Sequence, residues 1–153
     1  MTSKPDFDLQ AAHKYFAPTC FNQAWDWIDK AQRTPEEEQE MILLSMASLW
    51  HWTQREDCTK RNLSVGYWQA SRVHALAGRA DEARRYGLLG LQVSQAEPPF
   101  YLGYAHEALA RAEMRAGNQG KMREYLAEAQ RLAGSVTDPE EKKMLEADLK
   151  TIG

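Results

Sequence analysis

The sequence predicts an all-α protein of about seven helices, arranged as antiparallel helical hairpins. Val and Ile together contribute only 7 of the 153 residues, whereas Ala contributes 21 and Leu 15. This bias favours helix and leaves little material for a buried sheet. Apolar residues recur at spacings of three and four positions, and capping residues and glycines separate the periodic stretches.

The expected elements follow one another along a single domain, residues 1–153. Residues 1–17 should form an N-terminal extension with a short helical turn over 9–16. A first helix pair over 18–55, a second over 61–96, a third over 99–133 and a capping helix over 138–150 come next. The individual helices are expected at 18–32, 35–55, 61–77, 80–96, 99–116, 119–133 and 138–150. Because the loops within the pairs are short, neighbouring helices should run antiparallel.

Capping residues mark two of the helix starts. Thr34-Pro35-Glu36-Glu37 has the pattern of a capping box, in which Thr34 accepts a hydrogen bond from the N–H of Glu37. Pro35 then takes the first helical position, where its missing N–H costs nothing. Asp138–Glu141 repeats the pattern before the last helix.

Glycines mark the helix ends. Gly78, Gly117 and Gly134 each follow a periodic stretch that ends in Ala, where a left-handed C-cap residue is expected. Gly87 and Gly90 instead lie inside the predicted helix 80–96. A glycine there costs about 1 kcal/mol relative to Ala unless another helix must approach closely. We therefore expect close helix crossing at these two positions.

Composition and charge exclude several classes of partner. The net charge is −3 and the pI is near 5.8, with charges close to balanced on either side of Gly78. This balance predicts no nucleic-acid partner and no anionic membrane surface. The longest apolar run, Met41–Leu44, is too short to span a bilayer, and the N-terminus leads into no apolar signal core. Cys20 and Cys58 are too few for a disulfide framework, so we expect reduced thiols in a cytoplasmic protein.

Comparing the chain with itself reveals a repeat. A shift of 39 residues places Gly78 on Gly117, and each unit contains a helix, a glycine turn and a second helix. The segment Ala77–Ala83 is similar to the Gly-x-x-x-Glu-Ala turn of the tetratricopeptide repeat, and residues 62–134 resemble two such units. The repeats are longer than the 34 residues of that family. The stretch 22–52 also resembles bacterial helical proteins to which no activity is attached.

The resemblance implies a short right-handed array of stacked hairpins whose concave groove binds a peptide or protein tail. The repeat register places one set of side chains on the groove wall: Trp68, Arg72, Tyr104, Glu107, Arg111 and Arg115. Arg72 and Arg111 are equivalent positions, and two guanidiniums beside aromatic rings suit a carboxylate or phosphate. We expect both to face solvent. The alternative is an internal ion pair, because Glu107 lies one helical turn before Arg111.

No catalytic residue, metal ion or cofactor is expected. The four histidines lie on separate predicted elements. The segment starting at His106-Glu107 resembles a zinc-peptidase helix, but Ala110 stands where the second histidine is required. Neither cysteine has an adjacent histidine, and no serine lies in a Gly-x-Ser-x-Gly context. The sequence therefore favours an interaction protein over an enzyme.

All five tryptophans lie between residues 25 and 68, and Met41–Trp52 is apolar nearly all round, so this helix should be covered on more than one side. Three functions stay open. The first is a helical-repeat module that binds a peptide or protein tail. The second is a small-molecule-binding protein or enzyme with a pocket walled by Trp50, His51, Trp52 and Trp68. The third is a structural homodimer that uses the tryptophan-rich N-terminal layer as its interface.

Overall fold

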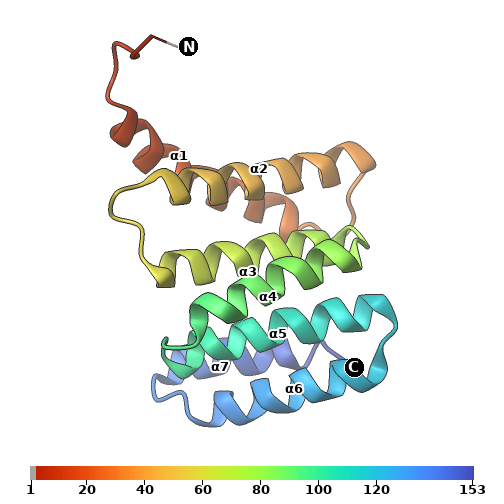
Figure 1. Cartoon of the computed structure of the whole chain (residues 1–153). Helices are drawn as coiled ribbons and strands as arrows, with labels where there is room; N and C mark the ends of the chain where they lie inside the picture. The colour runs from red at the N-terminus through yellow and green to blue at the C-terminus, as the bar shows by residue number, and fades with distance from the viewer. Residues whose placement is uncertain (1–2) are drawn as a thin grey trace. The chain divides into compact units, whose positions relative to one another are not determined.

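The computed structural model describes residues 3–153, and within this range it contains seven helices and no strand, as the sequence predicts (Figure 1). Residues 1 and 2 of the predicted extension lie outside the described range. The chain divides into two compact units, of which the first ends at Thr59 and the second comprises Lys60–Gly153. Six helices begin and end within two residues of their predicted limits. That residues 1–153 form one domain stays a prediction.

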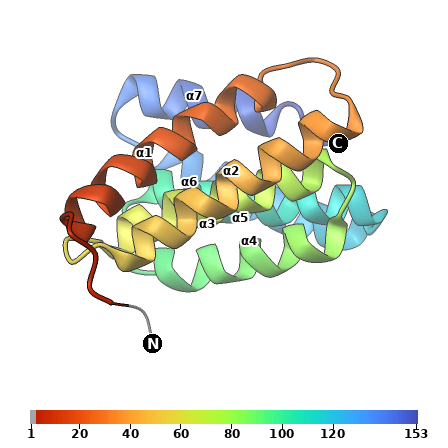
Figure 2. The ribbon, with the colours of Figure 1, turned by 90° about the horizontal axis from the view of Figure 1, so that it is seen from above.

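The first unit is a hairpin of α1 (Leu9–Ile28) and α2 (Pro35–Gln54), which run alongside each other (Figure 2). The predicted capping box at the start of α2 is confirmed. The Thr34 hydroxyl accepts from the N–H of Glu37 at 3.2 Å, and the Glu37 carboxylate accepts from the N–H of Thr34 at 2.9 Å. These bonds satisfy two donors that the first turn of a helix otherwise leaves open.

The course of α1 differs from the prediction. The helix starts at Leu9 and continues through Pro18, where the sequence predicted an extension over 1–17 and a helix over 18–32. A proline inside a helix removes one backbone hydrogen bond, so a helix that continues through Pro18 needs other support there. Packing against α2 compensates for this loss, because Ala17 is fully buried and its carbonyl accepts a hydrogen bond of 2.7 Å from the Ser48 hydroxyl.

The second unit stacks the other five helices: α3 (Lys60–Leu76), α4 (Ala80–Ser94), α5 (Pro99–Ala116), α6 (Gln119–Gly134) and α7 (Pro139–Leu149). Each helix packs on the next one along the chain. In addition, α3 packs on α5, and α5 packs on α7. The first helix of each hairpin and the C-terminal helix therefore form one layer, which consists of α3, α5 and α7 and which we call the wall. The helices α4 and α6 pack behind it.

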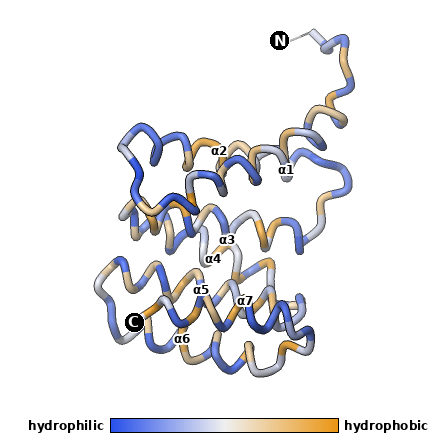
Figure 3. Tube along the Cα trace, turned by 180° about the vertical axis from the view of Figure 1, so that it is seen from behind, coloured by the Kyte–Doolittle hydropathy of each residue, from blue (hydrophilic) through white to orange (hydrophobic). Residues whose placement is uncertain are grey.

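Hydrophilic and hydrophobic segments alternate along the helices in Figure 3, as amphipathic helices with one buried face require. In the second unit, a cluster of buried residues joins α5, α6, α7 and the segments that follow α6 and α7: Tyr104, Ala110, Met122, Ala129, Ala133, Val136, Leu145, Leu149 and Ile152. The C-terminal helix is therefore part of the core of this unit.

Two of the three predicted C-cap glycines adopt the left-handed conformation, with φ of 75° at Gly78 and 76° at Gly117. The prediction for Gly134 is wrong. This residue is the last of α6, and Ser135 follows it in a right-handed helical conformation. The N–H of Ser135 bonds to the Leu132 carbonyl three residues back, a tight ending that needs no left-handed residue.

The predicted close crossing is confirmed at both helical glycines. A Cβ atom at Gly87 would lie 2.8 Å from Cδ2 of Leu109, and one at Gly90 would lie 3.3 Å from Cβ of Tyr67. Leu109 is fully buried, so it has little room to move away. Glycine thus sets the distance at which α4 packs on α3 and α5.

We expect Gly87→Ala to lower the free energy of unfolding by about 1–2 kcal/mol, because overpacking against Leu109 outweighs the higher helix propensity of Ala. Gly120→Ala is the matched control, since nothing lies within 4 Å of a Cβ at that position. This control should be neutral or stabilising by up to about 1 kcal/mol. Urea denaturation measures both variants, and a stabilised Gly87→Ala would contradict the close crossing.

Candidate functional site

Glu107 of α5 is a fully buried acid with three side-chain partners. Its Oε1 accepts hydrogen bonds from the guanidinium of Arg111 at 2.7 and 2.9 Å and from Arg72 Nη2 at 3.1 Å. Its Oε2 accepts from the indole N–H of Trp68 at 2.9 Å. Burying a carboxylate costs several kcal/mol unless it is paired and hydrogen-bonded. The buried position of Glu107 between α3 and α5 therefore depends on these three partners.

Residues at the C-terminal end of α7 close the same cluster. Arg111 Nη2 donates to the Thr151 hydroxyl at 2.7 Å and to the Asp148 carbonyl at 3.3 Å. The Tyr104 hydroxyl donates to the Asp148 carboxylate at 2.7 Å. Arg72 Nη2 also approaches Asp148, with 3.7 Å to Oδ1. The polar contacts of α5 thus reach both of its neighbours in the wall.

Four charged side chains of alternating sign run across α3, α5 and α7, and we call them the charge ladder: Arg72, Glu107, Arg111 and Asp148. Aromatic rings flank it. The Trp68 ring lies 5.3 Å from the Tyr104 ring and also 5.3 Å from the Arg72 guanidinium. Burial, and then the hydrogen bond to Asp148, raise the pKa of Tyr104 far above its ordinary value, so its hydroxyl stays a donor.

The repeat register placed the correct residues together, because Trp68, Arg72, Tyr104, Glu107 and Arg111 form one cluster. The expectation that Arg72 and Arg111 face solvent is wrong. Arg111 is 8% exposed, and the Arg72 side chain is 13% exposed. The internal ion pair with Glu107, which was the alternative, is present.

Arg115 does not join the cluster. It is exposed near the end of α5, beside the turn at Gly78. Conversely, sequence reasoning missed Asp148 and Thr151. The repeat gives a weak signal for this segment. Adding its shift of 39 residues to the position of Arg111 leads to position 150, which lies between Asp148 and Thr151.

The second set of candidate residues lies on the first unit and converges only in part. The rings of Trp50 and His51 are 4.9 Å apart, and His13 lies beside both at 5.4 and 5.1 Å. Phe16 stacks on His51 at 5.3 Å. Trp52 lies about 200° further around α2 and packs under the Arg55 guanidinium at 4.0 Å. Trp50, His51 and Trp52 therefore do not wall one pocket.

The histidines of this cluster form a direct pair. The Nδ1 atoms of His13 and His51 are 2.8 Å apart, so one ring donates its N–H and the other accepts. Burial, and then the neighbouring His13, lower the pKa of His51. Protonating the accepting ring would remove the hydrogen bond and place a positive charge against the N–H of the other ring.

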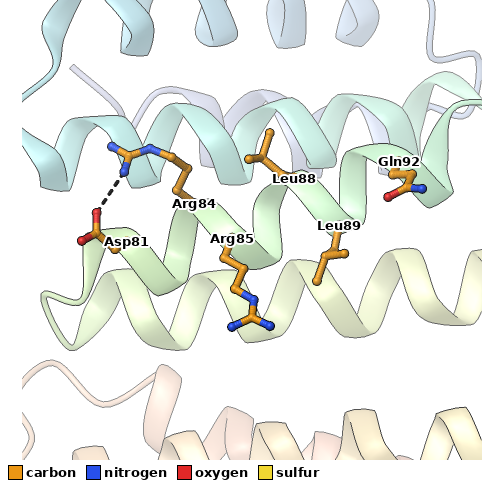
Figure 4. Close-up of a pocket in the computed structure, with 6 residues that line it drawn as sticks. All are labelled: Asp81, Arg84, Arg85, Leu88, Leu89 and Gln92. Carbon is orange, nitrogen blue, oxygen red and sulfur yellow. Dashed lines mark hydrogen bonds and ion pairs between the residues drawn. The ribbon is translucent and has the colours of Figure 1, made fainter.

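A shallow hollow of about 440 Å³ runs along α4 (Figure 4). Its lining residues are Asp81, Arg84, Arg85, Leu88, Leu89 and Gln92. Arg84 is engaged by Asp81 at 3.0 Å and by two hydrogen bonds of 2.5 and 3.1 Å to the Glu113 carboxylate. Because one helix supplies the whole lining, the hollow lacks the enclosing walls of a small-molecule site.

Within residues 3–153, no three His, Cys, Asp or Glu side chains gather as metal ligands would. Cys20 and Cys58 are free thiols, and burial raises the pKa of both, which disfavours the reactive thiolate. No helix in the described part of the chain combines the length with the apolarity that crossing a bilayer requires. The charge ladder and the cluster around Trp50 are thus the two candidate sites.

We expect Glu107→Gln to lower the free energy of unfolding by about 3–5 kcal/mol, because it leaves the buried guanidinium of Arg111 without its counter-charge. Glu128→Gln is the matched control, since Glu128 forms a more exposed pair with Arg131 at 2.5 Å on α6. The control should cost less than about 1 kcal/mol. Chemical denaturation measures both, and equal small losses would contradict the structural role of the ladder.

The stability should also fall as the pH drops below about 6.5, the ordinary pKa of histidine in an unfolded chain. Because the folded pKa of His51 is lowered, the unfolded state takes up its proton first, and each step downward in pH favours unfolding. Urea denaturation at pH 7.5 and 5.5 measures the difference. His51→Gln should make the difference in the free energy of unfolding between the two pH values smaller. It should not abolish this difference, since burial also lowers the pKa of His106. An unchanged pH dependence in this variant would contradict the role of the pair.

Comparison of the chain with protein-family models, with curated proteins and with solved structures gives no match.

Proposed function

We propose that this chain is a small helical-repeat interaction module, similar to tetratricopeptide-repeat proteins, that binds a peptide or protein tail through an anionic group. The stacking of α3 to α7 supports this proposal, because the wall of first helices is the usual binding face of helical repeats. Charge supports it as well. Residues 60–153 contain 14 Lys and Arg against 12 Asp and Glu, a net charge of +2 that favours an acidic partner.

The observation that carries the proposal is the incomplete pairing of Arg72. Its Nε is buried and has no hydrogen-bond partner among the described residues. Its contact with Asp148, at 3.7 Å, is longer than its 3.1 Å contact with Glu107. Arg111, in contrast, donates hydrogen bonds to Glu107 and Thr151, so its guanidinium is already paired within the fold. Arg72 is therefore the position where a partner's anionic group would bind.

Asp148 marks the open edge of the ladder, because its side chain is about a third exposed. A carboxylate from a partner that replaced Asp148 beside Arg72 could accept from both Nε and Nη2, a bidentate pair that Asp148 does not form. Trp68 adds an aromatic surface beside this guanidinium.

An array of peptides with acidic C-terminal tails tests the proposal, with each tail presented as a free carboxylate and as an amide. Free tails should be retained over amides. For retained tails, fluorescence anisotropy should show that Arg72→Gln weakens binding by about tenfold or more, the range for a hydrogen bond to a charged group. Arg131→Gln, an exposed arginine on α6, is the control and should leave binding unchanged.

Arg72→Lys separates lost binding from lost stability, because lysine keeps the charge beside Glu107 but cannot form a bidentate pair. This variant should keep most of the melting temperature and still bind weakly. Wild-type affinity in Arg72→Gln would contradict the proposal, whereas equal retention of free and amidated tails would assign the anionic group to an acidic side chain of the tail.

A further inference from the structure

One side of α2 is apolar and uncovered. Leu43 and Trp50 lie opposite the buried residues of this helix and are 56% and 54% exposed. Ala47 lies between them, so the three residues follow the alternating spacing of four and three that lets one helix pack along another. The small side chain of Ala47 at the centre permits close approach of a second helix.

Phe16 of α1 extends this surface. It is 44% exposed and stacks on His51, whose ring adjoins Trp50. Rings from both helices therefore form one surface, which we call the hairpin face: Phe16, Leu43, Ala47, Trp50 and His51. Aromatic residues, and Trp above all, dominate the binding energy of protein interfaces.

The charge of the first unit indicates the chemistry of the partner. Residues 3–59 contain 5 Lys and Arg against 10 Asp and Glu, a net charge of −5. Three of the basic side chains are engaged within the unit: Lys30 pairs with Glu37, Arg55 pairs with Asp57, and Arg33 donates to the carbonyls of Trp27 and Lys30.

Two of the acidic side chains border the hairpin face directly. Glu36 and Glu40 precede Leu43 on the same side of α2, by about two turns and one turn. Both are exposed, and neither has an ion-pair partner in the part of the chain that the structure describes. The face thus combines an apolar stripe with two exposed carboxylates that form no ion pair among the described residues.

We propose that the hairpin face binds a basic amphipathic helix of a partner protein. The apolar side of that helix would lie along Leu43, Ala47 and Trp50, and its Lys or Arg residues would meet Glu36 and Glu40. Charge disfavours a second copy of the chain as the occupant, because two units of net charge −5 would face each other. The partner is therefore a different protein from the acidic tail proposed for Arg72, and the two proposals stand independently.

Two synthetic helical peptides of about 18 residues, or five turns, test the proposal. Both carry Leu on one face, and the other face is Lys in the first peptide and Glu in the second. Titrated into the full chain and followed by isothermal calorimetry, the Lys peptide should bind at least about tenfold more tightly than the Glu peptide, and added salt should weaken it.

Substitutions locate the binding surface. Leu43→Glu and Trp50→Ala should each weaken the Lys peptide by about tenfold or more, as expected for apolar anchors. Leu88→Glu is the matched control, since Leu88 is a similarly exposed leucine, at 47%, on α4. It should leave binding unchanged. Circular dichroism checks that each variant keeps its helix content.

Three results would overturn the proposal. The first is equal binding of the Lys and Glu peptides. The second is a loss in Leu88→Glu as large as in Leu43→Glu, which would mean general attraction to an acidic protein. The third is a dimer in sedimentation equilibrium that Leu43→Glu converts to a monomer, which would make a second copy the occupant of the face.

Discussion

The second unit depends on a carboxylate that is shielded from water. Glu107 is buried where α3 and α5 meet, and it is tolerated there only because Trp68, Arg72 and Arg111 donate to it. Apolar contacts alone hold helices together over a range of similar registers, whereas a buried charge requires its partners at particular positions. We infer that the carboxylate fixes how α3 sits against α5.

The same constraint extends to α7 through Arg111. A guanidinium has five N–H donors, and Glu107 accepts only part of them. Thr151 and the Asp148 carbonyl accept from Nη2 as well, which ties the chain end to the wall. The ring of Tyr104 contributes in a second way, since it packs on Trp68 and Phe100 while its hydroxyl reaches Asp148. Polar and apolar contacts thus specify the same arrangement.

Features that depend on near neighbours in the sequence could be predicted. The capping box at Thr34, the left-handed glycines at 78 and 117 and the limits of six helices all follow from contacts within one or two turns. The clustering of Trp68 with Arg111 followed from the repeat period. Features that depend on distant contacts could not be predicted. α1 continues through Pro18 because Ser48 supports Ala17, and Arg111 is buried because residues up to 40 positions away reach it.

Helical-repeat proteins commonly gain or lose whole units during evolution, because each unit contacts only its neighbours. The charge ladder imposes a different rule on this chain. Removing the α5–α6 hairpin would delete Glu107 and Arg111 together, and Arg72 would then depend on Asp148 alone. Duplicating that hairpin would introduce a second buried acid whose donors must also be duplicated in register. The charge ladder therefore couples α3, α5 and α7, so that deleting or duplicating one hairpin would leave charged side chains without their present partners.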